Sequence, residues 1–216
     1  MHRLLALLIP IVVLATSSPR AANPANVAPA ELGKHWAAST QAEQNRDYTG
    51  ALESMKSFQQ RGGDPFLTML RVGWLQFQAG DYAKSSQSYG RAVSLKPTSL
   101  NALLGSLNAA EALQDVRKTA LVAEAVLRVE PTNYRALMLL AGMYFAQKDY
   151  RKAAAGYGRV LLTYPDDPDA LSGAAWSALR MGDKAAALST FTLLLSMSPQ
   201  YPSAQEGYDL ASGAAH

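Results

Sequence analysis

The sequence contains no cysteine and few histidines, and these shortages remove several classes of function. Without cysteine, a disulfide scaffold, a thiol nucleophile and cysteine-ligated zinc are excluded. The three histidines, His2, His35 and His216, leave almost nothing for a histidine-rich metal site or a Ser-His-Asp triad. The two adjacent glycines, Gly62 and Gly63, fall at the boundary of a repeat and form no phosphate-binding loop. We therefore predict a protein that is not an enzyme and has neither a metal ion nor a cofactor.

A strong excess of charge of either sign is also missing. The chain has 20 basic and 17 acidic residues. Two of the bases, Arg3 and Arg20, lie in a segment that we expect to be removed, which leaves 18 bases against 17 acids. Nucleic-acid binding needs clustered positive charge, so we predict no nucleic-acid partner. Arg117-Lys118 and Arg151-Lys152 are isolated basic pairs and are interpreted as solvated faces of helices, not as a membrane-binding surface.

The one long apolar run lies at the N-terminus. Residues 1–3 form a short region with a basic side chain, Arg3, residues 4–15 are apolar and contain a proline, and small residues follow. This layout is typical of a secretory signal, and twelve apolar residues are too few to span a bilayer. We expect a signal peptide over 1–22 and a flexible Pro/Ala-rich leader over 23–31. Cleavage after Ser17 or after residue 22 stays open, and an uncleaved anchor is the alternative. The mature chain is predicted to be periplasmic or secreted, without a transmembrane segment.

The most informative feature is an internal period of 34 residues. Aspartate recurs on this period five times and proline four times, at Asp47, Asp81, Asp115, Asp149 and Asp183 and at Pro97, Pro131, Pro165 and Pro199. Each period reads as two amphipathic helices. A left-handed glycine would end the first helix, the aspartate would cap the second, and the proline would end it. Thr98, Thr132 and Asp166 are expected to cap the first helix of the following period.

The pattern resembles the tetratricopeptide repeat. With repeats over 32–65, 66–99, 100–133, 134–167 and 168–201, small residues fall at position 8 (Gly73, Ala141), aromatic rings at position 24 (Tyr89, Tyr157) and prolines at position 32. The third repeat departs most, with leucine at position 8 and alanine at position 24. The resemblance implies an all-α, right-handed superhelical solenoid of about five helix-turn-helix repeats. Residues 202–216 would then form a capping helix and tail.

The resemblance also implies a binding site, because the first helices of such repeats line a concave groove. All three tryptophans fall at positions that usually face this groove. The expected partner is a peptide or helix of another protein, held among apolar side chains with arginines near an acidic flank. Two alternatives stay open: the rings pack between neighbouring helices, or the leader fills the groove. The predicted concave-face residues are Trp36, Leu70, Arg71, Trp74, Phe77, Leu104, Asn108, Arg135, Met138, Phe145, Trp176 and Arg180.

The residues also bear on which protein partners are excluded. The carboxylate clamp of chaperone-binding relatives is absent, because position 5 is apolar or Ser172. His35 is interpreted as a packing residue. The group of Asp166, Asp167 and Asp169 is interpreted as helix capping, not as a calcium site. The resemblance favours an adaptor or assembly factor of the bacterial envelope, in secretion, pilus assembly, outer-membrane biogenesis, polysaccharide export or cytochrome maturation. The alternative is a homo-oligomeric scaffold that associates through its convex face or its ends.

Overall fold

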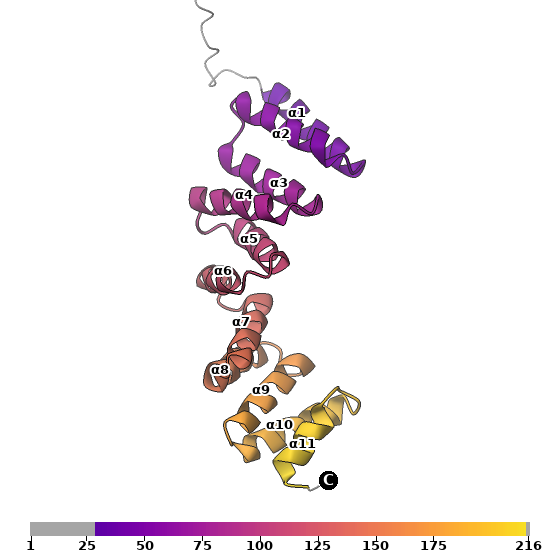
Figure 1. The fold of residues 1–216 in the computed structure, drawn as a ribbon, viewed down its shortest axis with the longest axis vertical. Coiled ribbons are helices and arrows are strands. Elements are labelled where there is room, and N and C mark those ends of the chain that lie inside the picture. Colours follow the sequence, from indigo (N-terminus) through magenta and orange to yellow (C-terminus); the bar gives the residue numbers. More distant parts are fainter. Residues whose placement is uncertain (1–28, 215–216) are drawn as a thin grey trace, which may run out of the picture.

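The computed structural model describes residues 29–214, and every regular element in this part of the chain is an α-helix (Figure 1). The expected signal peptide, 1–22, lies outside the described residues, as do residues 23–28 of the expected leader. The first helix begins at Pro29. The last three residues that we assigned to the flexible leader, 29–31, are therefore helical.

Eleven helices occupy residues 29–214, and they stack in chain order along the long axis of the molecule (Figure 1). Ten of them form five antiparallel pairs, and the short last helix covers the end of the stack. This arrangement confirms the predicted all-α solenoid of five helix pairs with a C-terminal capping helix. The helices are α1 (Pro29–Gln44), α2 (Tyr48–Gln60), α3 (Pro65–Gln78), α4 (Tyr82–Leu95), α5 (Leu100–Ala112), α6 (Val116–Val129), α7 (Tyr134–Ala146), α8 (Tyr150–Leu161), α9 (Pro168–Arg180), α10 (Lys184–Met197) and α11 (Ala204–Ser212).

The periodic aspartates cap the second helix of every pair, as predicted. Each accepts a hydrogen bond from the backbone N–H three residues later, at N···O distances between 2.9 Å for Asp47 and 3.2 Å for Asp149. The same bond is made by Asp81, Asp115 and Asp183. Such a side chain satisfies one of the backbone donors that a helix start leaves unpaired. The 34-residue aspartate period therefore fixes where each second helix begins.

The caps of the later first helices were predicted one residue too early. They are Ser99, Asn133 and Asp167 in place of Thr98, Thr132 and Asp166. In each case the residue after the proline lies in the turn, and the next residue supplies the capping oxygen. Asp167 Oδ1, for example, accepts from the Ala170 N–H at 2.7 Å. Capping was the right interpretation of this aspartate, although we had assigned the cap to its neighbour.

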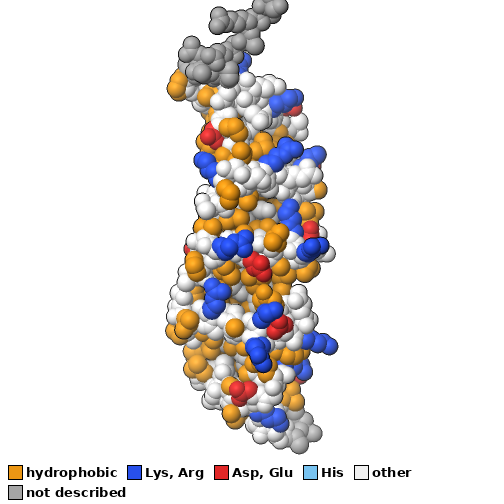
Figure 2. All heavy atoms as spheres, turned by 90° about the vertical axis from the view of Figure 1, so that its left-hand side faces the viewer, with side chains coloured by type: hydrophobic (Ala, Val, Ile, Leu, Met, Phe, Trp, Pro, Cys, Tyr) orange, Lys and Arg blue, Asp and Glu red, His pale blue; other side chains and the backbone are white. Residues whose placement is uncertain are grey.

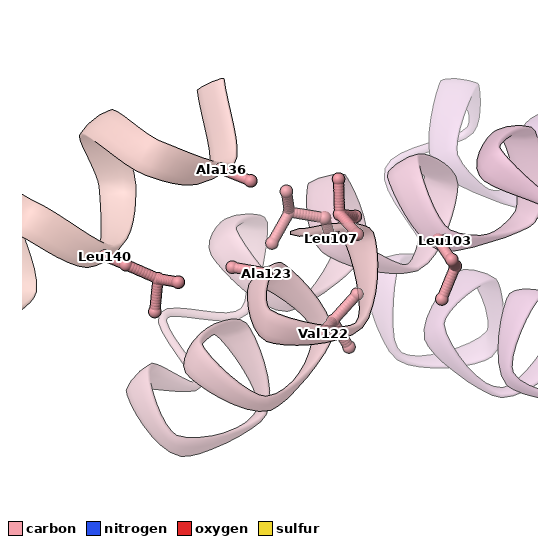
Figure 3. Packing of buried hydrophobic residues seen from close by; sticks show 7 residues of the cluster. Leu103, Leu107, Val122, Ala123, Ala136 and Leu140 are labelled. Atoms are coloured by element: carbon pink, nitrogen blue, oxygen red, sulfur yellow. The ribbon is translucent and has the colours of Figure 1, made fainter. Parts of the chain in front are cut away.

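The core runs through the stack as a series of small apolar clusters between pairs of helices. The central cluster joins α5, α6 and α7, and Figure 3 shows how its side chains point toward one another. Aromatic rings at position 24 pack on a glycine of the next first helix. A Cβ on Gly105 would lie 2.2 Å from a ring carbon of Tyr89, and the same close approach joins Tyr157 to Gly173. These glycines are required because any side chain would occupy the space of the ring.

The capping helix repeats this arrangement at the end of the stack. The ring of Phe191 on α10 lies against Gly207 on α11. Ala204 and Ala211 of α11 are buried on the same side, whereas Gln205 and Glu206 are exposed. A terminal repeat needs polar side chains on its outer face, because no further repeat covers it, although Leu210 of α11 is also exposed.

Candidate functional site

Six of the predicted groove residues surround one hollow of about 420 Å³ in the N-terminal half of the array. They come from the first helices α1, α3 and α5. The ring of Tyr89, from the second helix α4, also lines the hollow and lies against Gly105 at one wall. The lining is mainly apolar, with a few side-chain amides and one guanidinium. The six residues are Trp36, Leu70, Arg71, Trp74, Leu104 and Asn108.

Glu43 organises this hollow from α1, although it does not line it. Its carboxylate accepts a hydrogen bond from Trp74 Nε1 and another from Arg71 Nη2, both at 2.5 Å. Burial alone would raise the pKa of Glu43, but these hydrogen bonds outweigh it, and the pKa lies below its ordinary value. The guanidinium carbon of Arg71 lies 6.0 Å from the centre of the Trp36 ring. Trp74 is 39% exposed, so the pair with Glu43 fixes its orientation while its ring stays accessible.

Three more predicted residues line a second hollow of about 410 Å³ near the C-terminus: Phe145, Trp176 and Arg180. The Trp176 ring meets Phe191 edge to face, with ring centres 5.5 Å apart. Arg180 also lies over the Trp176 ring, with its guanidinium carbon 5.5 Å from the ring centre. Glu206 of the capping helix lies at the same hollow and gives it an acidic wall. Trp176 is therefore half-buried and partly a packing residue.

The other three predicted residues lie outside these two hollows. Met138 lines a separate apolar hollow beside the turn between α5 and α6. Phe77 packs on Tyr82 of its own repeat, with ring centres 5.1 Å apart. Arg135 donates hydrogen bonds to Asn108 and Glu111 across the junction of the third and fourth repeats. Ten of the twelve residues thus line three separate hollows, and Phe77 and Arg135 make contacts beside them.

Family comparisons agree with this architecture. Three family models described as tetratricopeptide repeat match residues 68–99, 108–176 and 169–201. The chain belongs to the tetratricopeptide repeat family. Repeats of this kind are in general non-catalytic modules for protein–protein interaction, and this chain carries that fold.

Solved structures of tetratricopeptide repeat proteins have the same fold. A repeat protein from Parabacteroides merdae superposes with a TM-score of 0.68 at 20% identity, covering 85% of this chain and 74% of its own. MamA from Desulfovibrio magneticus superposes with a TM-score of 0.62 at 17% identity, covering 80% of this chain and 97% of its own. At these identities the likeness concerns the fold alone.

A curated relative is similar over part of the sequence. The putative cytochrome c-type biogenesis protein CcmH of Haemophilus influenzae is 33% identical over 101 residues, which is 45% of this chain and 22% of that protein. The match thus spans about a fifth of the length of this relative.

The tyrosines at position 24 are the site residues that sequence reasoning missed. Tyr89 and Tyr157 each line one of the two hollows and are almost fully buried. Burial raises the pKa of Tyr89 to about 12 and also raises the pKa of Tyr157. A signal was present, because the word Tyr-Gly-Arg recurs two repeats apart at these positions. The sequence singled out these rings only as the aromatic residues at position 24, and the structure places one of them at each hollow.

The aspartate group at 166–169 and His35 were the other candidate sites in the sequence, and among the residues that it describes the structure shows no metal site or catalytic arrangement of side chains at either. Asp169 accepts a hydrogen bond from the Tyr201 hydroxyl at 2.6 Å, and His35 is half-buried on α1. Across residues 29–214, no group of three acidic or histidine side chains is placed to hold a metal ion. Within the same range, no helix is both long enough and apolar enough to cross a bilayer.

Proposed function

We propose that the protein is a non-catalytic adaptor that binds a peptide or helical segment of another protein on the face formed by its first helices. Trp74 carries this proposal, since it is an accessible ring held in one orientation by Glu43 at an apolar hollow. Tryptophan is a favoured anchor at protein interfaces. If the groove aromatics lose on the order of 500 Å², the gain is roughly 12 kcal/mol. Association costs of about 4–15 kcal/mol offset much of it, so micromolar binding is expected.

The place of action that we propose is the bacterial envelope. The support is the signal-like pattern of residues 1–22 and the partial likeness to a putative cytochrome c-type biogenesis protein. The protein would then be periplasmic or secreted and would act as an assembly factor in an envelope pathway. Cytochrome maturation is one such pathway, and secretion, pilus assembly, polysaccharide export and outer-membrane assembly are others.

Affinity capture from a periplasmic extract tests this function. The mature protein is compared with the Trp74→Ala/Trp176→Ala variant, after thermal melts have shown that the variant is folded. Leu162→Ala is the matched control, because Leu162 is 85% exposed at the end of α8 and belongs to neither hollow. We expect a partner that the control retains and the double variant loses. Equal capture by all three proteins would move the interface away from the first helices.

Self-association is the second candidate function, and the C-terminal end favours it. Leu193 and Met197 on α10 and Leu210 on α11 are exposed there. A contact between arrays through this end would cover them. Light scattering of the full chain, of Leu210→Glu and of a chain lacking residues 202–216 measures the mass directly. A dimeric full chain and monomeric variants would support the scaffold, whereas a monomeric full chain at high concentration would reject it.

A further inference from the structure

The two faces of the array differ in charge, although the whole chain is nearly balanced. The first helices carry four basic and four acidic side chains. The second helices carry ten basic and two acidic ones. Figure 2 shows Lys and Arg side chains along the side on which α6 and α8 lie in Figure 1. The capping aspartates at the helix starts reduce this excess without removing it. The outer face, built by the second helices, is therefore basic.

A hollow of about 470 Å³ lies on this face, between α6 and α8 and above α7. Its floor is apolar and consists mainly of Leu137, Leu140 and Ala141. The hollow exists because α8 presents small residues there, Ala155 and Gly156. A larger side chain at Ala155 would fill the space, whereas a Cβ on Gly156 would lie only 2.9 Å from the Cβ of Ala141 on α7. The outer face thus has an apolar depression at the point where its helices carry the most bases.

The rim of the hollow consists of three bases and one acid: Arg128, Lys152, Arg159 and Glu124. Arg159 donates to the Pro131 carbonyl at 2.7 Å, which fixes the guanidinium at the rim. Lys152 pairs with Asp149 at 3.0 Å and lies over the Tyr144 ring. Arg128 makes no hydrogen bond or ion pair with the residues of 29–214. The rim is therefore positive and includes one base without a partner.

We infer that this outer hollow binds an acidic amphipathic segment of a partner protein, with apolar side chains in the hollow and carboxylates against the basic rim. Complementary charge sets the orientation of such a segment and raises its rate of association. A flat anionic membrane fits the observations less well, because it would touch only the outermost bases and leave the apolar floor empty. The inference does not rest on the proposed function, since the outer hollow is lined by α6, α7 and α8 and shares no residue with the hollow at Trp74.

Peptide selection on the full chain tests this inference. A phage-displayed random 16-residue library is selected against the wild-type protein, and the selected peptides are measured by fluorescence anisotropy. We expect net-acidic peptides with apolar residues at helical spacing. Their affinity should fall at least tenfold in Arg128→Glu/Lys152→Glu and fall steeply with salt. Ala155→Trp should also lower the affinity, because the indole would occupy the hollow while no charge changes. Ala155 is exposed, so the fold should tolerate the larger side chain.

Two controls separate this site from the others. Lys56→Glu/Arg91→Glu reverses two exposed bases on α2 and α4 of the same face, far from the hollow, and should change the affinity little. Trp74→Ala should leave it unchanged, even if it abolishes binding of the envelope partner. Neutral or basic selected peptides, or equal loss in both charge reversals, would overturn the inference. So would binding of phosphatidylglycerol vesicles that depends on Arg128 and Lys152 when no selected peptide does.

Discussion

Leu107 and Ala123 pack together in the core of the third repeat with their usual sizes exchanged (Figure 3). In the repeats on either side, a small residue at position 8 faces a ring at position 24, as Gly73 faces Tyr89. Here the first helix supplies the large side chain and the second helix supplies the small one. Both residues are fully buried, so the volume is conserved while its source changes.

The exchange predicts non-additive effects on stability. Leu107→Ala should lose about 2–5 kcal/mol because it opens a cavity. Ala123→Leu should lose about 1–3 kcal/mol because the site is full. The double variant Leu107→Ala/Ala123→Leu should lose clearly less than the sum, since each change relieves the other. Urea denaturation of the four proteins measures the coupling. Additive losses, within about 0.5 kcal/mol, would show that the two side chains do not share one space.

Within the five repeats, three turns between paired helices adopt the left-handed conformation without glycine. Gln114 has φ of 55°, and Arg46 and Lys148 are similar, whereas Gly182 at an equivalent turn has φ of 85°. A side chain in this region is strained, so Gln114→Gly should stabilise the fold by about 0.5–1 kcal/mol.

Gly182→Ala is the matched reverse substitution and should destabilise the fold by a similar amount. The shift of the midpoint in urea measures both effects. A loss of stability in Gln114→Gly would mean that the Gln114 side chain makes a contact worth more than the strain.

Two helical glycines should respond in opposite ways to alanine. Gly105→Ala would place its Cβ 2.2 Å from the Tyr89 ring, so the variant should be clearly destabilised. Gly90 on α4 has no neighbour within 4 Å of the same position, and Gly90→Ala should gain about 0.5–1 kcal/mol from helix propensity. Thermal unfolding of both variants measures the difference. Similar melting temperatures would argue against the close contact of ring and helix.

The link between Glu43 and Trp74 should respond to acid. The pKa of Glu43 is lowered in the folded state, so its contribution to stability is present at neutral pH. That contribution is lost as the pH falls below 4.5, the ordinary value, and through the lowered pKa of the folded state.

Fluorescence of a variant that keeps Trp74 as its single tryptophan reports this titration directly. Glu43→Gln in the same background should remove the acid transition, because the amide does not titrate in this range. A transition that persists unchanged in Glu43→Gln would assign it to another carboxylate.

The sequence predicted the helix pairs and the caps of the second helices because the aspartates that make them repeat every 34 residues. It misplaced the caps of the first helices by one residue, since both Thr98 and Ser99 can cap a helix and only the backbone path selects one. The repeat positions also indicated which residues belong to the groove face, but they did not indicate which of these residues share a hollow. Phe77 meets a tyrosine of its own repeat, whereas Trp74 reaches a glutamate of the preceding repeat.

The basic outer face was hidden in the sequence for a different reason. The net charge of the chain is close to zero, and Arg128 lies 24 residues before Lys152 and in another helix than Lys152 and Arg159. They meet only because α6 and α8 are adjacent on one side of the stack. In the sequence, Leu107 and Ala123 are two separate departures from the repeat pattern. That the large residue at position 8 compensates for the small one at position 24 is visible only when both positions are considered together.

The ring at position 24 of one repeat packs on a glycine in the first helix that follows. This contact determines which single repeat could be removed without disrupting the junction between its two neighbours. Without residues 168–201, Tyr157 would face Gly207 of the capping helix, which accommodates a ring. Without residues 100–133, Tyr89 would face Leu139, and the two side chains would collide. Without residues 134–167, Ala123 would face Gly173 and leave a void. Removal of the fifth repeat would thus leave a ring-on-glycine contact at the new junction. Removal of the third or the fourth repeat would not, because the residues brought together there do not fit each other.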